Sequence, residues 1–340
     1  MRVIIDAFGG DNAPAAVLQG AVLAVGDGYD ITLTGDEERI RKTAAELSLS
    51  LDGITVAHAP DVITMEDAPR SILKAHKDCS MAVGLQMLAR GEGDAFVSAG
   101  STGALVMGAT FFVKRIKGVP RAAIATLIPT AAGRPSLLLD AGANADCRPE
   151  MLRQFAQMGS VYMSRVLGGG KPATVGLINI GTEDTKGGEL QQEAFALLRD
   201  CDINFIGNVE AREVPFGAAD VLVTDGFTGN VLLKGMEGSV SMLMKEVKGL
   251  FMQNLRTKIA GALARPHIGG LKKRMSTNEY GGAPVLGVCR PVIKAHGNSD
   301  ATAIRSAVRA AAEFARTGVI EAITDAVKNR GDESDEGHEG

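Results

Sequence analysis

A pattern of apolar strand, glycine turn and helix occurs twice in the chain and limits its fold more than any other feature. Residues 94–103 and 220–229 both follow D-x-x-V-[ST]-x-G-x-T-G. In each copy an apolar run ends at a hydroxyl residue, the turn follows, and helical spacing resumes, in the second copy at Asn230.

In open α/β sheets such turns lie at the carboxyl ends of the strands, where ligands bind, and the backbone N–H groups that start a helix attract anions. Both turns could instead be ordinary tight turns whose glycines serve only the local backbone. The recurrence favours one anion site lined from two sides, by Gly100, Ser101, Thr102, Gly103, Asp225, Gly226, Thr228 and Gly229.

Short apolar runs alternate with segments of helical spacing along nearly the whole chain. We expect strands at 2–6, 31–35, 54–57, 94–98, 122–128, 136–140, 175–179, 203–207, 219–224 and 291–294. We expect helices at 14–25, 37–47, 71–90, 104–117, 149–167, 189–199, from 230 onward, 301–317 and 319–328, and a loop around 281–284. This order predicts a three-layer α/β/α fold with a mostly parallel sheet. Residues 1–329 are expected to form one domain, and the acidic residues 330–340 a disordered tail.

Composition argues against several classes of protein. Aromatic residues make up only 4% and Trp is absent, so stacking on nucleic-acid bases is not indicated. The longest apolar stretch, 104–113, is about half of a bilayer-spanning helix, and the chain enters a strand without a charged leader, so we expect a cytoplasmic protein. Cys79, Cys147, Cys201 and Cys289 are far apart, which predicts buried thiols and neither disulfides nor a metal site.

Basic charge is concentrated in one segment. Residues 245–274 carry eight of the 36 Lys and Arg but one of the 40 acids, Glu246. Apolar residues recur in the same segment at steps of three or four, from Val247 to Leu263. The stripe fits the core of the monomer or of a dimer, contact with an anionic membrane surface, or docking of an acidic carrier protein, and the residues alone leave all three open.

Other polar groups also follow predicted strands. They are Gly9, Gly10 and Asp11; Asn144; Thr182, Glu183 and Lys186; Asn208 and Glu210; Asn230; Lys272 and Arg274; and Lys294 and His296. This set can bind an anion but contains no G-x-S-x-G elbow, Walker loop or H-E-x-x-H helix. If phosphate is itself the nucleophile no reactive side chain is needed, because phosphate is largely dianionic at neutral pH, with a second pKa of about 6 to 7.

Six runs of residues resemble the bacterial phosphate acyltransferases of phospholipid synthesis: 6–14, 98–105, 181–187, 205–212, 224–230 and 292–297. The resemblance covers residues 1–329 in order. It implies a fold similar to that of isocitrate and isopropylmalate dehydrogenases and of phosphotransacetylase. It also implies transfer of a fatty acyl group from acyl-(acyl carrier protein) to orthophosphate, without a cofactor or metal.

The resemblance also implies partners and residue roles. The partners are acyl carrier protein, a second copy of the chain in a homodimer, and the inner face of the membrane, where a glycerol-3-phosphate acyltransferase uses the acyl phosphate. Lys186 and Asn230 match active-site residues of the family, and a third active-site cation falls on Lys272 or Arg274. The family's membrane-contacting segment falls on residues 257–266.

Two rival functions remain at this stage. A nicotinamide-dependent dehydrogenase of the same fold is disfavoured because the chain lacks the G-x-G-x-x-G spacing and metal-binding acids. The other rival is a non-catalytic scaffold for lipid enzymes at the membrane.

Overall fold

Successive residues of the central strands are buried on opposite faces of one sheet. In β1 (Arg2–Asp6), Val3 and Ile5 pack on one face and Ile4 on the other, and Leu137 and Leu138 of β6 (Ser136–Leu139) divide in the same way. Because both faces are buried, the strands are apolar throughout, as in sheets covered by helices on both sides. The computed structural model describes residues 1–275 and 280–328, with only the backbone of 271–274 and 328.

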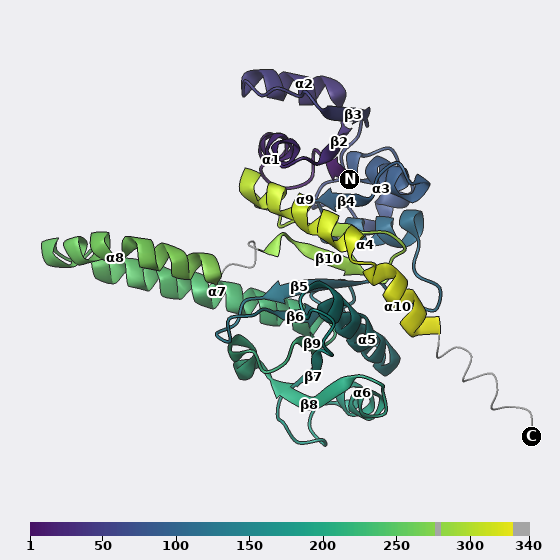
Figure 1. Cartoon of the computed structure of the whole chain (residues 1–340), viewed down its shortest axis with the longest axis vertical. Helices are drawn as coiled ribbons and strands as arrows, with labels where there is room; N and C mark the ends of the chain where they lie inside the picture. The colour runs from purple at the N-terminus through teal and green to yellow at the C-terminus, as the bar shows by residue number, and fades with distance from the viewer. Residues whose placement is uncertain (276–279, 329–340) are drawn as a thin grey trace, which may run out of the picture.

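Across the described residues eleven strands form one sheet, in the order β3-β2-β1-β4-β11-β10-β5-β6-β9-β7-β8 (Figure 1). Besides β1 and β6 they are β2 (Asp30–Gly35), β3 (Ile54–His58), β4 (Ala95–Ser98), β5 (Ala123–Ile128), β7 (Thr174–Asn179), β8 (Asn204–Glu210), β9 (Val221–Val223), β10 (Ala283–Leu286) and β11 (Val292–Lys294). Seven of the ten neighbouring pairs are parallel, and only the pairs that involve β5 or β10 are antiparallel.

Helices cover both faces, which gives the predicted three layers. One face carries α1 (Ala15–Gly26), α2 (Glu37–Glu46), α5 (Pro149–Val166), α6 (Glu189–Arg199), α9 (Ala301–Arg316) and α10 (Val319–Lys328). The other carries α3 (Ser80–Arg90), α4 (Thr102–Gly108) and the start of α7 (Gly226–Phe251), with the short turns Pro69–Leu73, Ala109–Val113 and Ala211–Phe216.

The two parallel halves of the sheet run in opposite directions along the ladder. Three antiparallel pairs separate β4 from β6 and β9, so the turn after β4 and the turn after β9 would lie at opposite edges of a flat sheet. Neighbouring strands rotate by about 20–25°, which adds up to about 100–125° over the five steps from β4 to β9. The twist therefore offsets the reversal and brings both turns toward one site.

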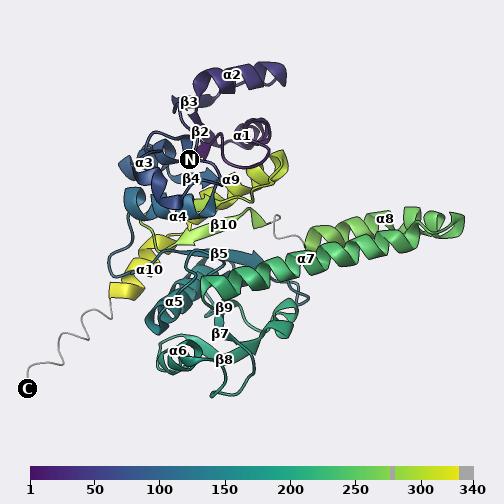
Figure 2. The ribbon, with the colours of Figure 1, turned by 180° about the vertical axis from the view of Figure 1, so that it is seen from behind.

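Helix α7 continues far beyond the sheet. Of its 26 residues only Gly226 and Gly229 are buried, and at 1.5 Å per residue the helix is about 39 Å long. Helix α8 (Leu255–Arg274) returns alongside it, and Gly261 leaves room for the ring of Phe251. Figure 2 shows the two helices as an arm that projects from the body.

Most of the predicted elements are present, but three predictions were wrong. The expected loop at 281–284 includes the start of strand β10, with Pro284 opposite Ile293. The helices predicted within 71–90 are present as the 3₁₀ turn Pro69–Leu73 and α3. The helix predicted at 104–117 ends as a π turn at Val113, and strand β8 continues through Asn208 to Glu210.

None of the helices in the described ranges combines the length and the apolarity that crossing a bilayer requires. The proposed tail, 330–340, lies outside the described residues.

Candidate active site

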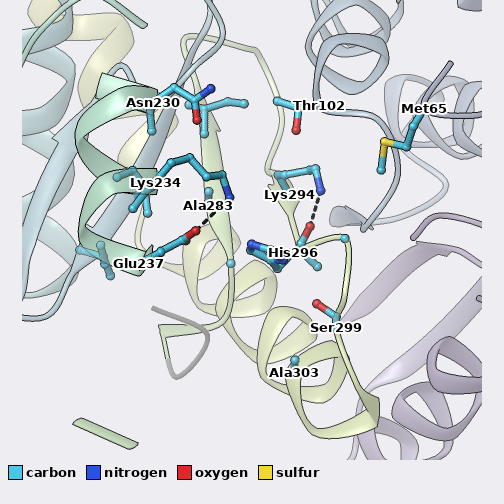
Figure 3. A pocket seen from close by; sticks show the side chains of 18 residues that line it. Met65, Thr102, Asn230, Lys234, Glu237, Ala283, Lys294, His296, Ser299 and Ala303 are labelled. Carbon is cyan, nitrogen blue, oxygen red and sulfur yellow. Dashed lines mark hydrogen bonds and ion pairs between the residues drawn. The ribbon is translucent and has the colours of Figure 1, made fainter. Parts of the chain in front are cut away.

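A cavity of about 250 Å³ lies between the two halves of the sheet (Figure 3). Asn230, Lys234 and Glu237 line it from α7 and face Lys294, the last residue of β11, and His296, two residues further on. The remaining lining is Met65, Thr102, Ile124, Thr126, Leu127, Ala141, Leu233, Gly282, Ala283, Ala295, Gly297, Ser299 and Ala303. Of the residues that the sequence predicted around an anion, Thr102, Asn230, Lys294 and His296 line this cavity.

The turns after β1 and β4 pack directly on each other. A methyl group on Gly9 would lie 2.6 Å from Asp6 Oδ2 and 2.7 Å from the Gly100 nitrogen. Ser98 Oγ donates to Asp6 Oδ2 at 2.7 Å and accepts from the Gly100 N–H at 3.0 Å. Burial raises the pKa of Asp6, and this carboxyl organises the backbone that presents Thr102 to the cavity.

The turn after β1 also contacts the segment that follows β11. The Asp11 N–H donates to the Gly297 carbonyl at 2.7 Å, and Gly10 has φ +100° with no room for a side chain against the same carbonyl. Gly9, Gly10, Asp11 and Gly100 thus hold cavity-lining segments together, and they are not among the residues that line it. Ser101 is the residue before α4, and Gly103 packs against Pro69.

The turn after β9 is shorter than predicted, because α7 begins at Gly226 and not at Asn230. Asp225 is the N-cap: its Oδ1 accepts from the Thr228 N–H at 2.8 Å and its Oδ2 from the Thr228 hydroxyl at 2.8 Å. The Asp225 carboxylate and the Thr228 hydroxyl therefore hydrogen bond to each other within the helix cap. Asn230, one turn into the helix, faces the cavity.

Gly226 and Gly229 pack against the chain that follows β6. A methyl group on Gly226 would lie 2.6 Å from the Asn144 carbonyl oxygen, and one on Gly229 only 2.0 Å from the Asp140 carbonyl oxygen. Neither glycine has a positive φ. These close contacts show a packing role for both glycines, which let α7 start directly on the 140–144 turn, and an anion near them stays a prediction.

Asp140 holds that turn in place. Its carboxylate accepts from the backbone N–H groups of Ile124, Gly142, Ala143 and Asn144, at 2.7–3.1 Å. The side-chain amide of Asn144 donates to Asp140 Oδ2 at 2.8 Å and to the Ala122 carbonyl at 2.9 Å. The side-chain N–H groups of Asn144 therefore donate within the turn, whereas the sequence predicted that Asn144 binds substrate.

Lys186 lies in the loop after β7, which two buried amides fix. Asn179 donates to the Lys186 carbonyl at 3.0 Å and to Asn208 Oδ1 at 3.0 Å, and Asn208 donates to the Glu183 carbonyl at 2.8 Å. The Lys186 ammonium is 3.9 Å from Glu183 Oε1, and its side chain is 46% exposed. Lys186 is not among the residues that line the cavity.

The remaining predicted residues are also outside the cavity lining. Thr182 is in the exposed loop with Lys186, and Glu210 ends β8 in an ion pair with Arg212 at 2.6 Å. Lys272 and Arg274 belong to the last turn of α8, and their side chains lie outside what the structure describes.

Lys294 belongs to the set of anion-binding groups predicted from the sequence, and it is the partly buried cation of the cavity. Its ammonium donates to the carbonyls of Ala99, at 3.1 Å, and Ala295. Burial lowers the pKa of Lys294 to about 8; Asp11 and Asp6 oppose this shift, and the charge of Lys234 adds to it. Lys234 had not been singled out, although it stands four residues after Asn230 and so on the same helix face.

Cys79 and Cys147 do not supply an activated nucleophile. Burial raises the pKa of Cys79 to about 11 and that of Cys147 to about 12, so both are neutral thiols at pH 7. Cys79 and Cys201 are buried as expected, but Cys147 is only partly buried and Cys289 is exposed.

The fold is shared with solved enzymes. A phosphotransacetylase from Streptococcus pyogenes matches with a TM-score of 0.62 and 16% identity, over 93% of this chain and 94% of that one. A 4-hydroxythreonine-4-phosphate dehydrogenase from Klebsiella pneumoniae matches with a TM-score of 0.55 and 11% identity, over 93% and 99%. These likenesses confirm the predicted fold, which is that of the isocitrate and isopropylmalate dehydrogenases.

Sequence comparison identifies the family. A family model described as "fatty acid synthesis protein" matches residues 1–322. A phosphate acyltransferase from Acetivibrio thermocellus is 46% identical over 325 residues, 95% of each chain, and one from Bacillus subtilis is 45% identical over 331 residues, 96% of this chain and 98% of that one. The chain therefore belongs to the phosphate acyltransferase family of fatty acid synthesis proteins, and it is an acyltransferase.

Proposed function

We propose that the protein transfers a fatty acyl group from acyl-(acyl carrier protein) to orthophosphate and so makes acyl phosphate for phospholipid synthesis. The observation that carries this proposal is the composition of the cavity. Ammonium groups and neutral donors, suited to phosphate, stand beside the apolar side chains Met65, Ile124, Leu127 and Leu233, suited to an acyl chain.

The chemistry requires positioning rather than a protein nucleophile. A phosphate oxygen bonds to the thioester carbonyl carbon, the carbon–sulfur bond breaks, and the proton of the phosphate hydroxyl ends on the departing sulfur. Negative charge develops on the carbonyl oxygen in between. Donors such as Asn230 and Thr102, held on rigid helix starts, stabilise that oxyanion, and one such donor contributes about 2.7–4 kcal/mol.

The direct test is to incubate the purified protein with an acyl-(acyl carrier protein) thioester and to follow the release of free carrier thiol. Release should require inorganic phosphate, and hydroxylamine should trap the acyl phosphate as a hydroxamate. Thiol release at the same rate without phosphate would show hydrolysis and would exclude the proposal.

Lys186 is proposed to assist phosphate, on the resemblance of the 181–187 run and not on its place relative to the cavity. Lys186→Ala should lower kcat by about 100- to 1000-fold if the lysine supports the transition state as an oxyanion donor does. The variant should keep its unfolding midpoint, because the side chain is half exposed. A folded Lys186→Ala protein with nearly wild-type activity would remove this assignment. Lys272 or Arg274 is proposed as a further cation on the same basis.

We also propose that the arm of α7 and α8 rests on the anionic surface of the membrane, where a glycerol-3-phosphate acyltransferase would take up the acyl phosphate. Leu255, Ile259 and Leu263 stand on one face of α8 and are between 56% and 76% exposed. Lysines and arginines of the same segment would attract acidic headgroups. The homodimer stays a prediction from the resemblance, tested by sedimentation equilibrium of the full chain.

A further inference from the structure

Two lysines from opposite halves of the sheet line the same cavity. Lys294 ends β11, which pairs with β4, whereas Lys234 stands on α7, which follows β9. Figure 3 shows them on facing walls. The positive charge of Lys234 adds to the lowering of the pKa of Lys294, which expresses the repulsion between the two ammonium groups. An anion with two charges placed between them would turn the repulsion into attraction.

We propose that inorganic phosphate binds between Lys294 and Lys234, a placement that rests on the proposed function for its role as the site of the attacking nucleophile. An ammonium group has three N–H donors. Two of those on Lys294 are directed to the carbonyls of Ala99 and Ala295, which carry no formal charge, so one donor and the whole positive charge remain for a ligand.

Neutral donors surround the two lysines. Ser299 and His296 line the same cavity and offer hydroxyl and imidazole groups to phosphate oxygens, and Thr102 and Asn230 are left for the carbonyl oxyanion. The lysines attract phosphate by their charge, and the neutral donors orient it by hydrogen bonds. This division suits a substrate that must be held firmly but oriented for attack.

Glu237 makes the assignment specific enough to test. Among the described residues that line the cavity it is the only carboxylate, and its Oε2 is 2.9 Å from the Lys234 ammonium. It therefore pairs with the Lys234 ammonium and would repel an incoming dianion. Removing the charge of Glu237 should strengthen phosphate binding, whereas removing the charge of either lysine should weaken it.

The experiment is calorimetric titration of inorganic phosphate into the full-length protein without an acyl donor. Lys294→Met should weaken binding at least tenfold and Lys234→Met several-fold, whereas Glu237→Gln should bind phosphate as tightly as wild type or more tightly. Lys42→Met, on the exposed face of α2, is the matched control and should bind like wild type. Lys294→Arg keeps the charge and should retain most of the affinity, which separates charge from folding if Lys294→Met is unstable.

Unchanged phosphate affinity in both Lys294→Met and Lys234→Met would overturn the inference, as would a wild-type protein that does not bind phosphate. Loss of binding in Lys186→Met with full binding in Lys294→Met would move the site to the loop after β7. If phosphate binds as described but no acyl phosphate forms, the site stands and the proposed function fails.

Discussion

Lys294 has an ammonium group that burial has made easier to deprotonate. In the unfolded chain its pKa would have the ordinary value of 10.5, and in the folded protein the value is lowered to about 8. The group is therefore charged in the native state below about pH 8 and loses its charge as the pH rises through that value. Any anion that depends on this charge should bind less well on the alkaline side.

Sulfate allows this titration to be observed alone, because it keeps both charges across neutral and weakly alkaline pH. We expect the affinity of the wild-type protein for sulfate to be level below about pH 8 and to fall by up to about tenfold per pH unit above it. In Lys294→Arg the guanidinium stays charged, so the affinity should be nearly independent of pH. A wild-type affinity that does not change across this range would contradict the role of Lys294.

Gly229 illustrates a residue whose side chain is excluded by packing. In Gly229→Ala the new methyl group would lie 2.0 Å from the Asp140 carbonyl oxygen, so α7 must move or the turn must distort. We expect the free energy of unfolding in urea to fall by about 1–3 kcal/mol. Gly235→Ala is the control on the same helix: nothing lies within 4 Å of its new methyl group, and it should gain about 0.5–1 kcal/mol. Equal stability of the two variants would show that the close approach of Gly229 is not important.

Polar residue types at strand ends could be predicted, but not what each one binds. Thr102, Asn230 and His296 were predicted and line the cavity. Asn144, Asn208 and Thr228 were predicted on the same grounds, yet they hydrogen bond to nearby turns and caps. The same amide or hydroxyl satisfies a ligand or a backbone group equally well, and only the final geometry decides between them.

Among the elements, the arm of α7 and α8 differs most from the rest of the fold, because its apolar side chains face outward. Its start is fixed on the 140–144 turn, so the arm projects from one wall of the cavity. The periodicity of 247–263 predicted helices here, as found, but it did not distinguish a buried stripe from an exposed one. That distinction depends on what lies opposite, which the segment itself does not encode.

Contact between the arm and lipid is tested by sedimentation with vesicles that contain anionic phospholipid. The double variant Ile259→Asp with Leu263→Asp should bind at least tenfold more weakly than wild type, since burying two such side chains contributes about 3–6 kcal/mol. The control, Ala260→Asp with Ala264→Asp, makes the same change of charge at the same spacing about 100° further round α8 and should lose much less binding. Equal loss in both variants would mean that charge alone holds the arm to vesicles.

The strand that was missed, β10, shows why element prediction failed where it did. Gly281, Gly282 and Pro284 are strong turn signals, and proline removes a backbone donor from a ladder. Pro284 is nevertheless paired with Ile293, where the sheet changes from parallel to antiparallel. Pairing of β10 with β11 on one side and β5 on the other outweighs the local turn preference of these residues.

At the scale of the whole molecule, the cavity exists because a single twisted sheet brings together two sets of strand ends. Repetition of the D-x-x-V-[ST]-x-G-x-T-G pattern predicted two facing turns, and Thr102 and Asn230 do line one cavity. The reversal of direction through β10, β5 and β6 was not predicted, because it depends on the pairing of β10 with β5, in which Val285 lies opposite Ile124, more than a hundred positions away. Lys294 and Lys234 line the same cavity only because these strands join the two halves of the sheet.

A cavity shared by both halves and without an activated thiol predicts direct transfer between two bound substrates. Cys79 and Cys147 have pKa values raised to about 11 and about 12, so neither is a thiolate at neutral pH. Initial rates at varied concentrations of acyl carrier thioester and phosphate should therefore give intersecting lines, not the parallel lines of a ping-pong reaction. Intact-mass spectra after mixing with the thioester alone should show no acylated protein, and Cys147→Ser should keep nearly wild-type activity. An acylated chain that forms without phosphate and then transfers its acyl group to it would replace this mechanism with a covalent one.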